Sequence, residues 1–343
     1  AIIDGTAKKL ALTKLGNGNL ILGGTQSNTY TGLTTVTGGT LSLNKSGATA
    51  ISGDIQIGDA VGSDVVSLMA SDQIADSSVL TFTAGASGNS AFLRLNGFNE
   101  TVKGIATSVA NAAVIENGTG GQGTLTVNTA GSDYVYDGII RNSTGVLALT
   151  KAGSGTLTLA DTAKITTISY TGTTTIDGGK LVLDDLDAFS SSFLINSTAA
   201  DALTFNQTTK NLTIGTGLSI TGSGAVTKTG AGTLTLTTSH SYTGPTTVRG
   251  GTLVLNGSLD QGSTVTVASG ATLSGTGTAN GTVIVQNGGH ISPGTATTPG
   301  YLYVGGLTLD QGSLLDYEFG SSSDQINLNN PDSLTLNGGA FNL

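Results

Sequence analysis

The stretch VTKTGAGTLTL (residues 226–236), followed after five residues by YTGPTTVRGGTLVL (residues 242–255), decides the fold of this 343-residue chain. In both blocks Leu or Val alternates with Thr, which places aliphatic side chains on one face of a strand and hydroxyls on the other. Branching at Cβ suits Thr and Val to a pleated strand. The Gly-x-Gly and Gly-Gly pairs mark corners between strands.

The same pair of blocks occurs three times, at 12–43, 149–183 and 226–255. From Lys14, Lys151 or Lys228 to the next marked Leu is 6 positions in every copy. From the Tyr to the Gly-Gly pair is always 8 positions, whereas the Lys-to-Tyr separation drifts between 14 and 19. Fixed strands joined by a loop of variable length indicate a solenoid with roughly 20–29 residues per turn.

We expect an all-β chain that folds as a right-handed parallel β-helix, one continuous elongated solenoid over residues 1–343. A coil of about 22 residues predicts about 16 coils and a rod roughly 75 Å long. Residues 44–146 read as more irregular coils, among them 65–69 and 109–115, and residues 256–343 as further coils. A β-sandwich is the alternative for short strands with Gly corners.

The amino-acid composition limits the classes of partner and of chemistry that the chain can have. The formal net charge of −9 disfavours nucleic acid and anionic membranes. The absence of Cys excludes disulfides, thiolate catalysis and Cys-type metal centres. No apolar run is long enough to span a membrane, and the start at Ala1 has no signal-peptide pattern. We therefore expect a mature product or an internal piece of a longer protein, whose export signal or anchor lies elsewhere.

The two blocks are similar to the passenger-associated (autotransporter-associated β-strand) repeat of bacterial autotransporters, and tracts such as 270–277 and 291–294 resemble the C-terminal passenger coils of that family. The resemblance implies a right-handed β-helical passenger domain on the outer surface of a Gram-negative bacterium, or released from it. It also implies adhesion, autoaggregation, biofilm structure or carriage of an effector domain as the role.

Acidic residues are densest at Asp184, Asp185 and Asp187. We interpret them as a solvated turn at the end of a coil, with a calcium site and a catalytic carboxylate pair as the alternatives. His240 and His290, the only histidines, are expected to be plain loop residues, because neither has a second His or a Cys nearby. We predict no catalytic residue, no metal and no cofactor.

Tyrosines fall into two groups. Alternation in Tyr301-Leu302-Tyr303-Val304 turns Tyr301 and Tyr303 outward, where they are candidates for surface binding. Tyr317 and Phe319 are expected in the core. Tyr30, Tyr170 and Tyr242 recur in register beside the glycine pairs 38–39, 178–179 and 250–251, which favours a structural role at a coil corner.

The sequence therefore predicts a non-enzymatic extracellular β-solenoid that serves as a stalk, adhesin or matrix component. Its partners would be other surface proteins, glycans or further copies of itself. The main alternative is a filament subunit that stacks head to tail through uncapped ends into a homopolymer. A polysaccharide-degrading β-helix is a third possibility, and an ice-binding face of Thr-x-Thr strings a fourth.

Overall fold

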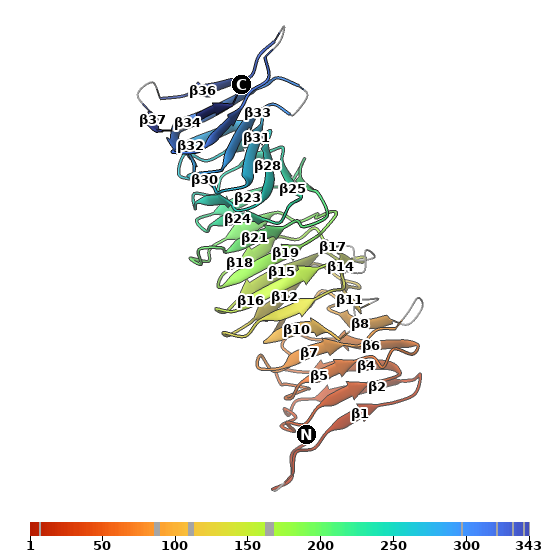
Figure 1. Cartoon of the computed structure of the whole chain (residues 1–343). Helices are drawn as coiled ribbons and strands as arrows, with labels where there is room; N and C mark the ends of the chain where they lie inside the picture. The colour runs from red at the N-terminus through yellow and green to blue at the C-terminus, as the bar shows by residue number, and fades with distance from the viewer. Residues whose placement is uncertain are drawn as a thin grey trace. The chain divides into compact units, whose positions relative to one another are not determined.

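The computed structural model describes residues 1–6, 8–85, 90–108, 113–161, 168–295, 298–319, 322–330, 333–338 and 340–342. Within these residues the chain is all-β and has no helix, so the described ranges offer no helical membrane span. Short strands pair in parallel, rung upon rung, as a β-solenoid (Figure 1). The chain divides into two compact units, Ala1–Gly179 and Lys180–Leu343.

The first unit contains two long parallel sheets. One has the order β1-β3-β5-β7-β10, with strands Leu12–Lys14, Thr34–Val36, Ile55–Ile57, Val79–Phe82 and Gly104–Thr107. The other has the order β2-β4-β6-β8-β11-β14-β17, with strands Asn19–Gly24, Gly39–Lys45, Ser63–Leu68, Ser90–Arg94, Ala113–Asn117, Ile139–Asn142 and Ile168–Ser169. Each sheet forms one wall of the solenoid.

Further rungs of the first unit lie in two smaller groups. β9, β12, β15 and β18 pair in that order and span Glu100–Val102, Gly123–Asn128, Leu147–Ala152 and Thr174–Ile176. β13 (Tyr134–Tyr136) pairs with β16 (Thr156–Ala160). The segment 44–146, expected to be irregular, thus carries strands that join regular ladders. Of the stretch 109–115, residues 109–112 lie outside the described part.

The second unit is also built from parallel walls. One runs β19-β21-β24-β27-β30-β32-β34, with strands Lys180–Asp184, Leu203–Asn206, Val226–Thr229, Thr246–Val248, Val265–Val267, Thr278–Val285 and Tyr301–Asp310. The long strand β34 also pairs with β36 (Gln325–Leu328) and β37 (Leu334–Asn337). β26 (Ser239–His240) and β29 (Ser258–Leu259) extend a ladder from the first half of β32.

The remaining wall of this unit runs β22-β25-β28-β31-β33-β35-β38, with strands Leu212–Ile214, Thr233–Leu236, Gly251–Leu255, Ala271–Gly275, His290–Pro293, Leu314–Asp316 and Ala340–Asn342. β20 (Phe193–Ile195) pairs with β23 (Ile220–Gly222). Three phenylalanines pack in this region, with the rings of Phe189 and Phe193 stacked at 4.8 Å and those of Phe193 and Phe205 edge to face at 5.9 Å.

The strand register confirms that the repeats form successive turns of a solenoid. It also shows that other turns contain more residues than the predicted value of about 22. Leu20 lies opposite Leu41 and Leu234 opposite Leu253, as the repeat spacing requires. Other turns are longer, since Val66 lies opposite Leu93, 27 positions later. The estimate of about 16 coils is therefore wrong, and the strands make about 13 turns. The right-handed winding stays a prediction, which the general preference for right-handed crossovers between parallel strands favours.

The core of each unit consists of the inward rows of the strands. In β4 the side chains of Leu41 and Leu43 are fully buried, and so are Leu253 and Leu255 in β28. Burying one such side chain stabilises the fold by about 1.5–3 kcal/mol. Each turn of the solenoid adds further buried side chains of this kind.

Candidate functional site

Each repeat copy is one corner of the solenoid in two successive turns. In the first copy, β1 and β2 form the lower corner and β3 and β4 form the upper one, with Lys14 opposite Val36 in the register. The second and third copies repeat this arrangement with Lys151 opposite Ile176 and Lys228 opposite Val248. The repeat thus comprises the same corner in two successive turns. Its lysine lies in the inward row of core positions.

The buried lysine joins the two successive turns by hydrogen bonds. Lys228 Nζ donates to the carbonyl oxygens of Thr229 at 2.7 Å and Gly230 at 2.8 Å in its own turn, and to Gly250 at 3.1 Å in the next. Lys151 makes the same three bonds to Ala152, Gly153 and Gly178 at 2.8–2.9 Å. Three acceptors satisfy the three protons of an ammonium that burial has removed from water.

Lys14 repeats this clamp with Leu15, Gly16 and Gly38 at 2.6–2.9 Å. Burial lowers the pKa of Lys151 and of Lys228 to about 8. Sequence reasoning used these lysines only as spacing markers and missed their burial, because a lysine at the end of a strand ordinarily faces solvent.

The repeat tyrosines lie just before the strands β3, β18 and β27, at the end opposite the glycine pairs. Tyr30, Tyr170 and Tyr242 are fully buried. Each phenol oxygen lies 2.6 Å from the Oγ1 of the threonine four positions later, Thr34, Thr174 or Thr246. Burial raises the pKa of Tyr242 to about 12. Sequence register identified these residues, whereas the Thr partner is evident only from the structure.

The glycine pairs allow two turns to approach closely at the corner. The second glycine of each pair has positive φ, 64° at Gly39, 59° at Gly179 and 60° at Gly251. A Cβ on Gly251 would lie 2.3 Å from the Gly232 carbonyl oxygen of the turn beneath. The first glycine is less constrained at Gly250, where the nearest atom to a Cβ would be 3.4 Å away.

The acidic turn is bound by its own chain. Asp185, with φ of 50°, accepts hydrogen bonds from the backbone amides of Thr208 at 2.6 Å and Thr209 at 3.0 Å, and from both threonine hydroxyls. Although partial desolvation opposes the effect, these bonds lower the pKa of Asp185 to about 2. Asp184 accepts from the Asn206 amide at 2.6 Å, and Asp187 pairs with Lys210 at 3.0 Å. Protein donors thus bind both oxygens of Asp185 and one oxygen each of Asp184 and Asp187.

Neither histidine is a plain loop residue, which corrects the sequence interpretation. His240 lies on β26 with 2% of its surface exposed, and its Nδ1 accepts from the Ile220 amide at 3.1 Å. Burial lowers the pKa of His240 to about 4. His290 lies on β33 and pairs with Asp316 at 2.7 Å. Among the described residues no group of three or more His, Cys, Asp or Glu is placed to hold a metal ion.

Two charge ladders were not foreseen from the sequence. Glu116, with 5% of its side chain exposed, pairs with Arg94 one rung below at 2.8 Å and with Arg141 one rung above at 2.7 Å. In the second unit Asp201 pairs with Lys180 at 3.1 Å and with Arg249 at 2.7 Å. Only the strand register brings these residues together, because the partners lie 21 to 48 positions apart in the sequence.

The outward tyrosines lie on the first half of β34. Tyr301 is 50% exposed and Tyr303 is 41% exposed. Phe319 does not fill the core as expected, because it is 64% exposed and stacks on Tyr317 with ring centroids 6.0 Å apart. The alternation failed there because Phe319 lies beyond the end of β35 at Asp316.

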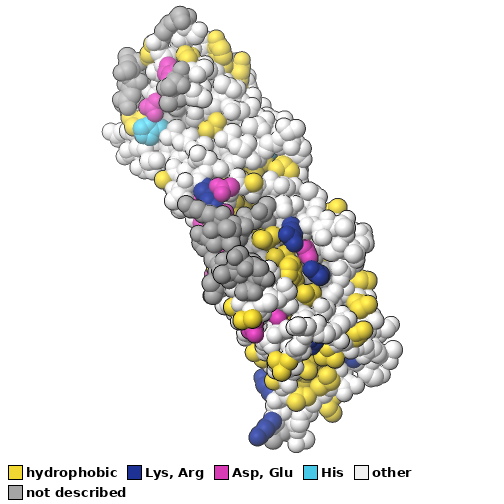
Figure 2. All heavy atoms as spheres, turned by 90° about the vertical axis from the view of Figure 1, so that its right-hand side faces the viewer, with side chains coloured by type: hydrophobic (Ala, Val, Ile, Leu, Met, Phe, Trp, Pro, Cys, Tyr) yellow, Lys and Arg dark blue, Asp and Glu magenta, His cyan; other side chains and the backbone are white. Residues whose placement is uncertain are grey.

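Most of the visible surface is neither charged nor apolar. On the face shown in Figure 2, backbone and uncharged polar side chains predominate, with scattered apolar patches and few charges. This agrees with a charged share of only 10%.

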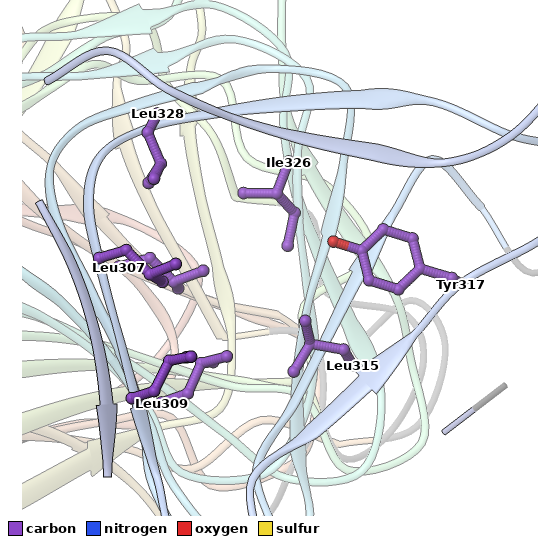
Figure 3. Close-up of a pocket in the computed structure, with 8 residues that line it drawn as sticks. Leu307, Leu309, Leu315, Tyr317, Ile326 and Leu328 are labelled. Carbon is purple, nitrogen blue, oxygen red and sulfur yellow. The ribbon is translucent and has the colours of Figure 1, made fainter. Parts of the chain in front are cut away.

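An apolar cavity opens beside β34, β36 and β37. It has a volume of about 150 Å³ and is lined by Leu307, Leu309, Leu315, Tyr317, Ile326, Leu328, Leu334 and Leu336. The labelled side chains converge on the hollow from facing strands (Figure 3). Leu334 and Leu336 are 48% and 56% exposed, so this rung leaves part of the apolar interior open.

Comparison with known proteins agrees with this anatomy. The sequence model of the passenger-associated-transport-repeat matches residues 12–43, 149–183 and 226–255, which are the three repeat copies described above. The chain is 32% identical over 216 residues to "Adhesin BmaC autotransporter" of Brucella suis biovar 1 (strain 1330). The aligned region is 62% of this chain but 5% of that protein. The molecule is a parallel β-solenoid that carries three passenger-associated-transport repeats and is distantly similar to an autotransporter adhesin.

Proposed function

We propose that the chain is a non-enzymatic part of an autotransporter passenger, displayed on or released from the outer surface of a Gram-negative bacterium, where it acts as a stalk and adhesin. One observation carries the proposal: the lysine and tyrosine that define each repeat are buried, and the glycine packs against the turn beneath. The repeat therefore builds the scaffold, and the outward hydroxyl and amide side chains are left to meet a partner.

Adhesion follows from the repetition of that outward surface. Turns stacked about 4.8 Å apart present the same kinds of polar groups at a fixed spacing. Each contact is weak, but contacts held on one rigid ladder act together and raise the overall avidity. The similarity to a protein named as an adhesin supports the same role.

Adherence of coated particles tests this function. Beads carrying the purified chain should adhere to cultured epithelial cells more than beads carrying albumin, and soluble chain should compete with them. A second unrelated β-solenoid on matched beads controls for shape and low charge. Equal adherence of all three coatings would contradict the proposal, and release of reducing sugar from polysaccharide would contradict its non-enzymatic part.

The open apolar rung favours a second candidate function, self-assembly into filaments. Leu334 and Leu336 are exposed at one side of the cavity, and Leu20, in the inward row of the terminal strand β2, is 37% exposed. Stacking the first rung of a second copy on the last rung of another would bury these side chains and continue the ladders. A head-to-tail contact of this kind does not close, so it produces fibres.

Electron microscopy and sedimentation at rising concentration test assembly. The double change Leu334→Lys and Leu336→Lys should abolish fibres, because it places charge in the apolar contact. Val61→Lys, at a residue 71% exposed away from the terminal rungs, should leave them unchanged. A chain that stays monomeric at every concentration would rule out the filament.

A further inference from the structure

A polar hollow lies beside the two exposed tyrosines. It is open to solvent, has a volume of about 370 Å³ and is lined by Asp260, Gln261, Asn280, Asn329 and Asn330. Strand register places these residues near the tyrosines, because Ser258, Thr278, Tyr303 and Asn327 follow one another across β29, β32, β34 and β36. The lining residues come two or three positions later on β32 or just after β29 and β36.

Next to the hollow, β34 packs tightly on the turn beneath it. At Gly305, two positions after Tyr303, a Cβ would lie 1.9 Å from the Asn280 carbonyl oxygen, so no side chain can fill this position. The ladder also shifts register between Ala279 and Thr282.

Amide side chains that line the hollow are held in fixed orientations. Asn280 Nδ2 donates to the Leu259 carbonyl oxygen at 2.7 Å, and Asn330 Nδ2 donates to the Gly305 carbonyl oxygen at 2.9 Å. Both side chains therefore have a defined position with their Oδ1 atoms left to accept. Asp260 is held in the same way, because its Oδ1 accepts from the Gly262 amide at 2.9 Å. Groups fixed in advance lose little freedom when they bind.

The tyrosines add flat apolar surface at the edge of the hollow. Tyr303 and Tyr301 precede Gly305 by two and four positions on the same strand, and two positions of a strand span about 7 Å. Both rings are substantially exposed, so their faces are accessible to a ligand that lies along β34. Aromatic rings of this kind offer an apolar body with a polar tip.

We propose that this surface, Tyr301 and Tyr303 with the hollow of Asp260, Gln261, Asn280, Asn329 and Asn330, binds a neutral oligosaccharide. A sugar ring has an apolar face that can lie on a tyrosine, and its hydroxyls donate to and accept from amides and a carboxylate. The lining holds one carboxylate and no cationic side chain, which disfavours acidic sugars. The inference rests on the proposed adhesin function, for which it supplies a receptor class.

Binding of defined sugars tests the site. The purified chain is titrated with cellohexaose, maltohexaose and mannohexaose, and with hexagalacturonate as an acidic comparison, by calorimetry and saturation-transfer NMR. At least one neutral sugar should bind, and Tyr303→Ala and Asn280→Ala should each weaken it about tenfold. Phe319→Ala, which removes an exposed ring outside the hollow, should not change the affinity. Unchanged circular dichroism shows that each variant remains folded.

Three results would overturn the proposal: no neutral sugar binds at millimolar concentration, the Tyr301→Ala and Tyr303→Ala double variant binds as the parent does, or hexagalacturonate binds as tightly as the neutral sugars. The bead assay separates this inference from the adhesin function. Beads that adhere although the chain binds no sugar leave adhesion standing and reject the site. Sugar binding without bead adherence supports the site and rejects adhesion.

Discussion

Lys151 Nζ donates to the carbonyl oxygen of Gly178, 27 positions further along the chain, at 2.8 Å. The two residues stand in successive turns of one corner, and the same contact joins Lys14 to Gly38 and Lys228 to Gly250. The lysine and glycine that recur in each repeat therefore form one set of contacts between successive turns. The contribution of each recurring residue to stability can be tested separately.

Removing the buried ammonium should destabilise the fold strongly. Lys228→Met keeps most of the stem but leaves the carbonyls of Thr229, Gly230 and Gly250 without their charged donor, a loss of about 3 kcal/mol in the free energy of unfolding. Urea denaturation followed by circular dichroism measures it. Lys180→Met, which removes an ammonium from a side chain 42% exposed, serves as the control and should cost about 0.5 kcal/mol. Equal losses in the two variants would refute the clamp.

The tyrosine hydroxyl should contribute one buried hydrogen bond. Tyr242→Phe removes the hydroxyl that lies 2.6 Å from the buried Thr246 Oγ1, which keeps Ser263 Oγ at 2.9 Å as its other partner, and should lower stability by about 1 kcal/mol. The exposed Tyr303→Phe should have no measurable effect. Thermal melts of both variants under the same conditions make the comparison. A Tyr242→Phe protein as stable as the parent would show that the hydroxyl contact is energetically neutral.

Substitution of the corner glycine should cost more than its backbone conformation alone. Gly251→Ala faces both a positive φ and a carbonyl oxygen 2.3 Å from the new Cβ, so we expect a loss of about 3 kcal/mol or more. Gly270 has a comparable φ of 73° but open space around it, and Gly270→Ala should cost only about 1 kcal/mol. Denaturation midpoints distinguish the two. Similar midpoints would mean that the turns can separate to admit a methyl group.

Glu100 should make stability depend on pH near neutrality. Burial raises the pKa of this carboxyl to about 8, against opposition from hydrogen bonds donated by the Gln73, Ile74 and Thr101 amides. The folded state keeps a proton that the unfolded chain loses near pH 4.5, so the contribution is complete below pH 4.5. It is lost progressively as the pH rises from about 4.5 to about 8, by on the order of 5 kcal/mol.

Urea midpoints measured from pH 4.5 to 8.5 check this dependence. The parent should become less stable across the range, and Glu100→Gln should flatten the curve because its amide does not titrate there. A parent and variant with parallel pH curves would contradict the assignment.

The repeat could be predicted from sequence to a useful depth. The fixed 6- and 8-position spacings gave the strands, the corners and the turn of Leu20 on Leu41, because pleating and glycine geometry act locally. The total number of turns could not be predicted in this way. Outside the repeats the loops vary, so that Ile140 lies opposite Ile168, 28 positions later.

Side-chain environments were harder to predict where they depend on the neighbouring turn. His240 reads as a loop residue until its partner Ile220 is placed in the turn beneath. Glu116 looks like a surface acid until the register sets it between two arginines. The exposure of Tyr301 and Tyr303 follows from alternation alone, but the amides beside them come from three other segments, so no local pattern could indicate the hollow.

Variable turn length has a consequence for how such a molecule can diversify. Val265 lies opposite Val283, only 18 positions later, whereas Ile140 needs 28 positions to reach its partner, and both pairs are in register in their sheets. Length differences are absorbed at the bends and leave the buried rows unaltered. A bend can therefore be lengthened or shortened, which alters the exposed surface, while the stacked interior that holds the turns together is kept.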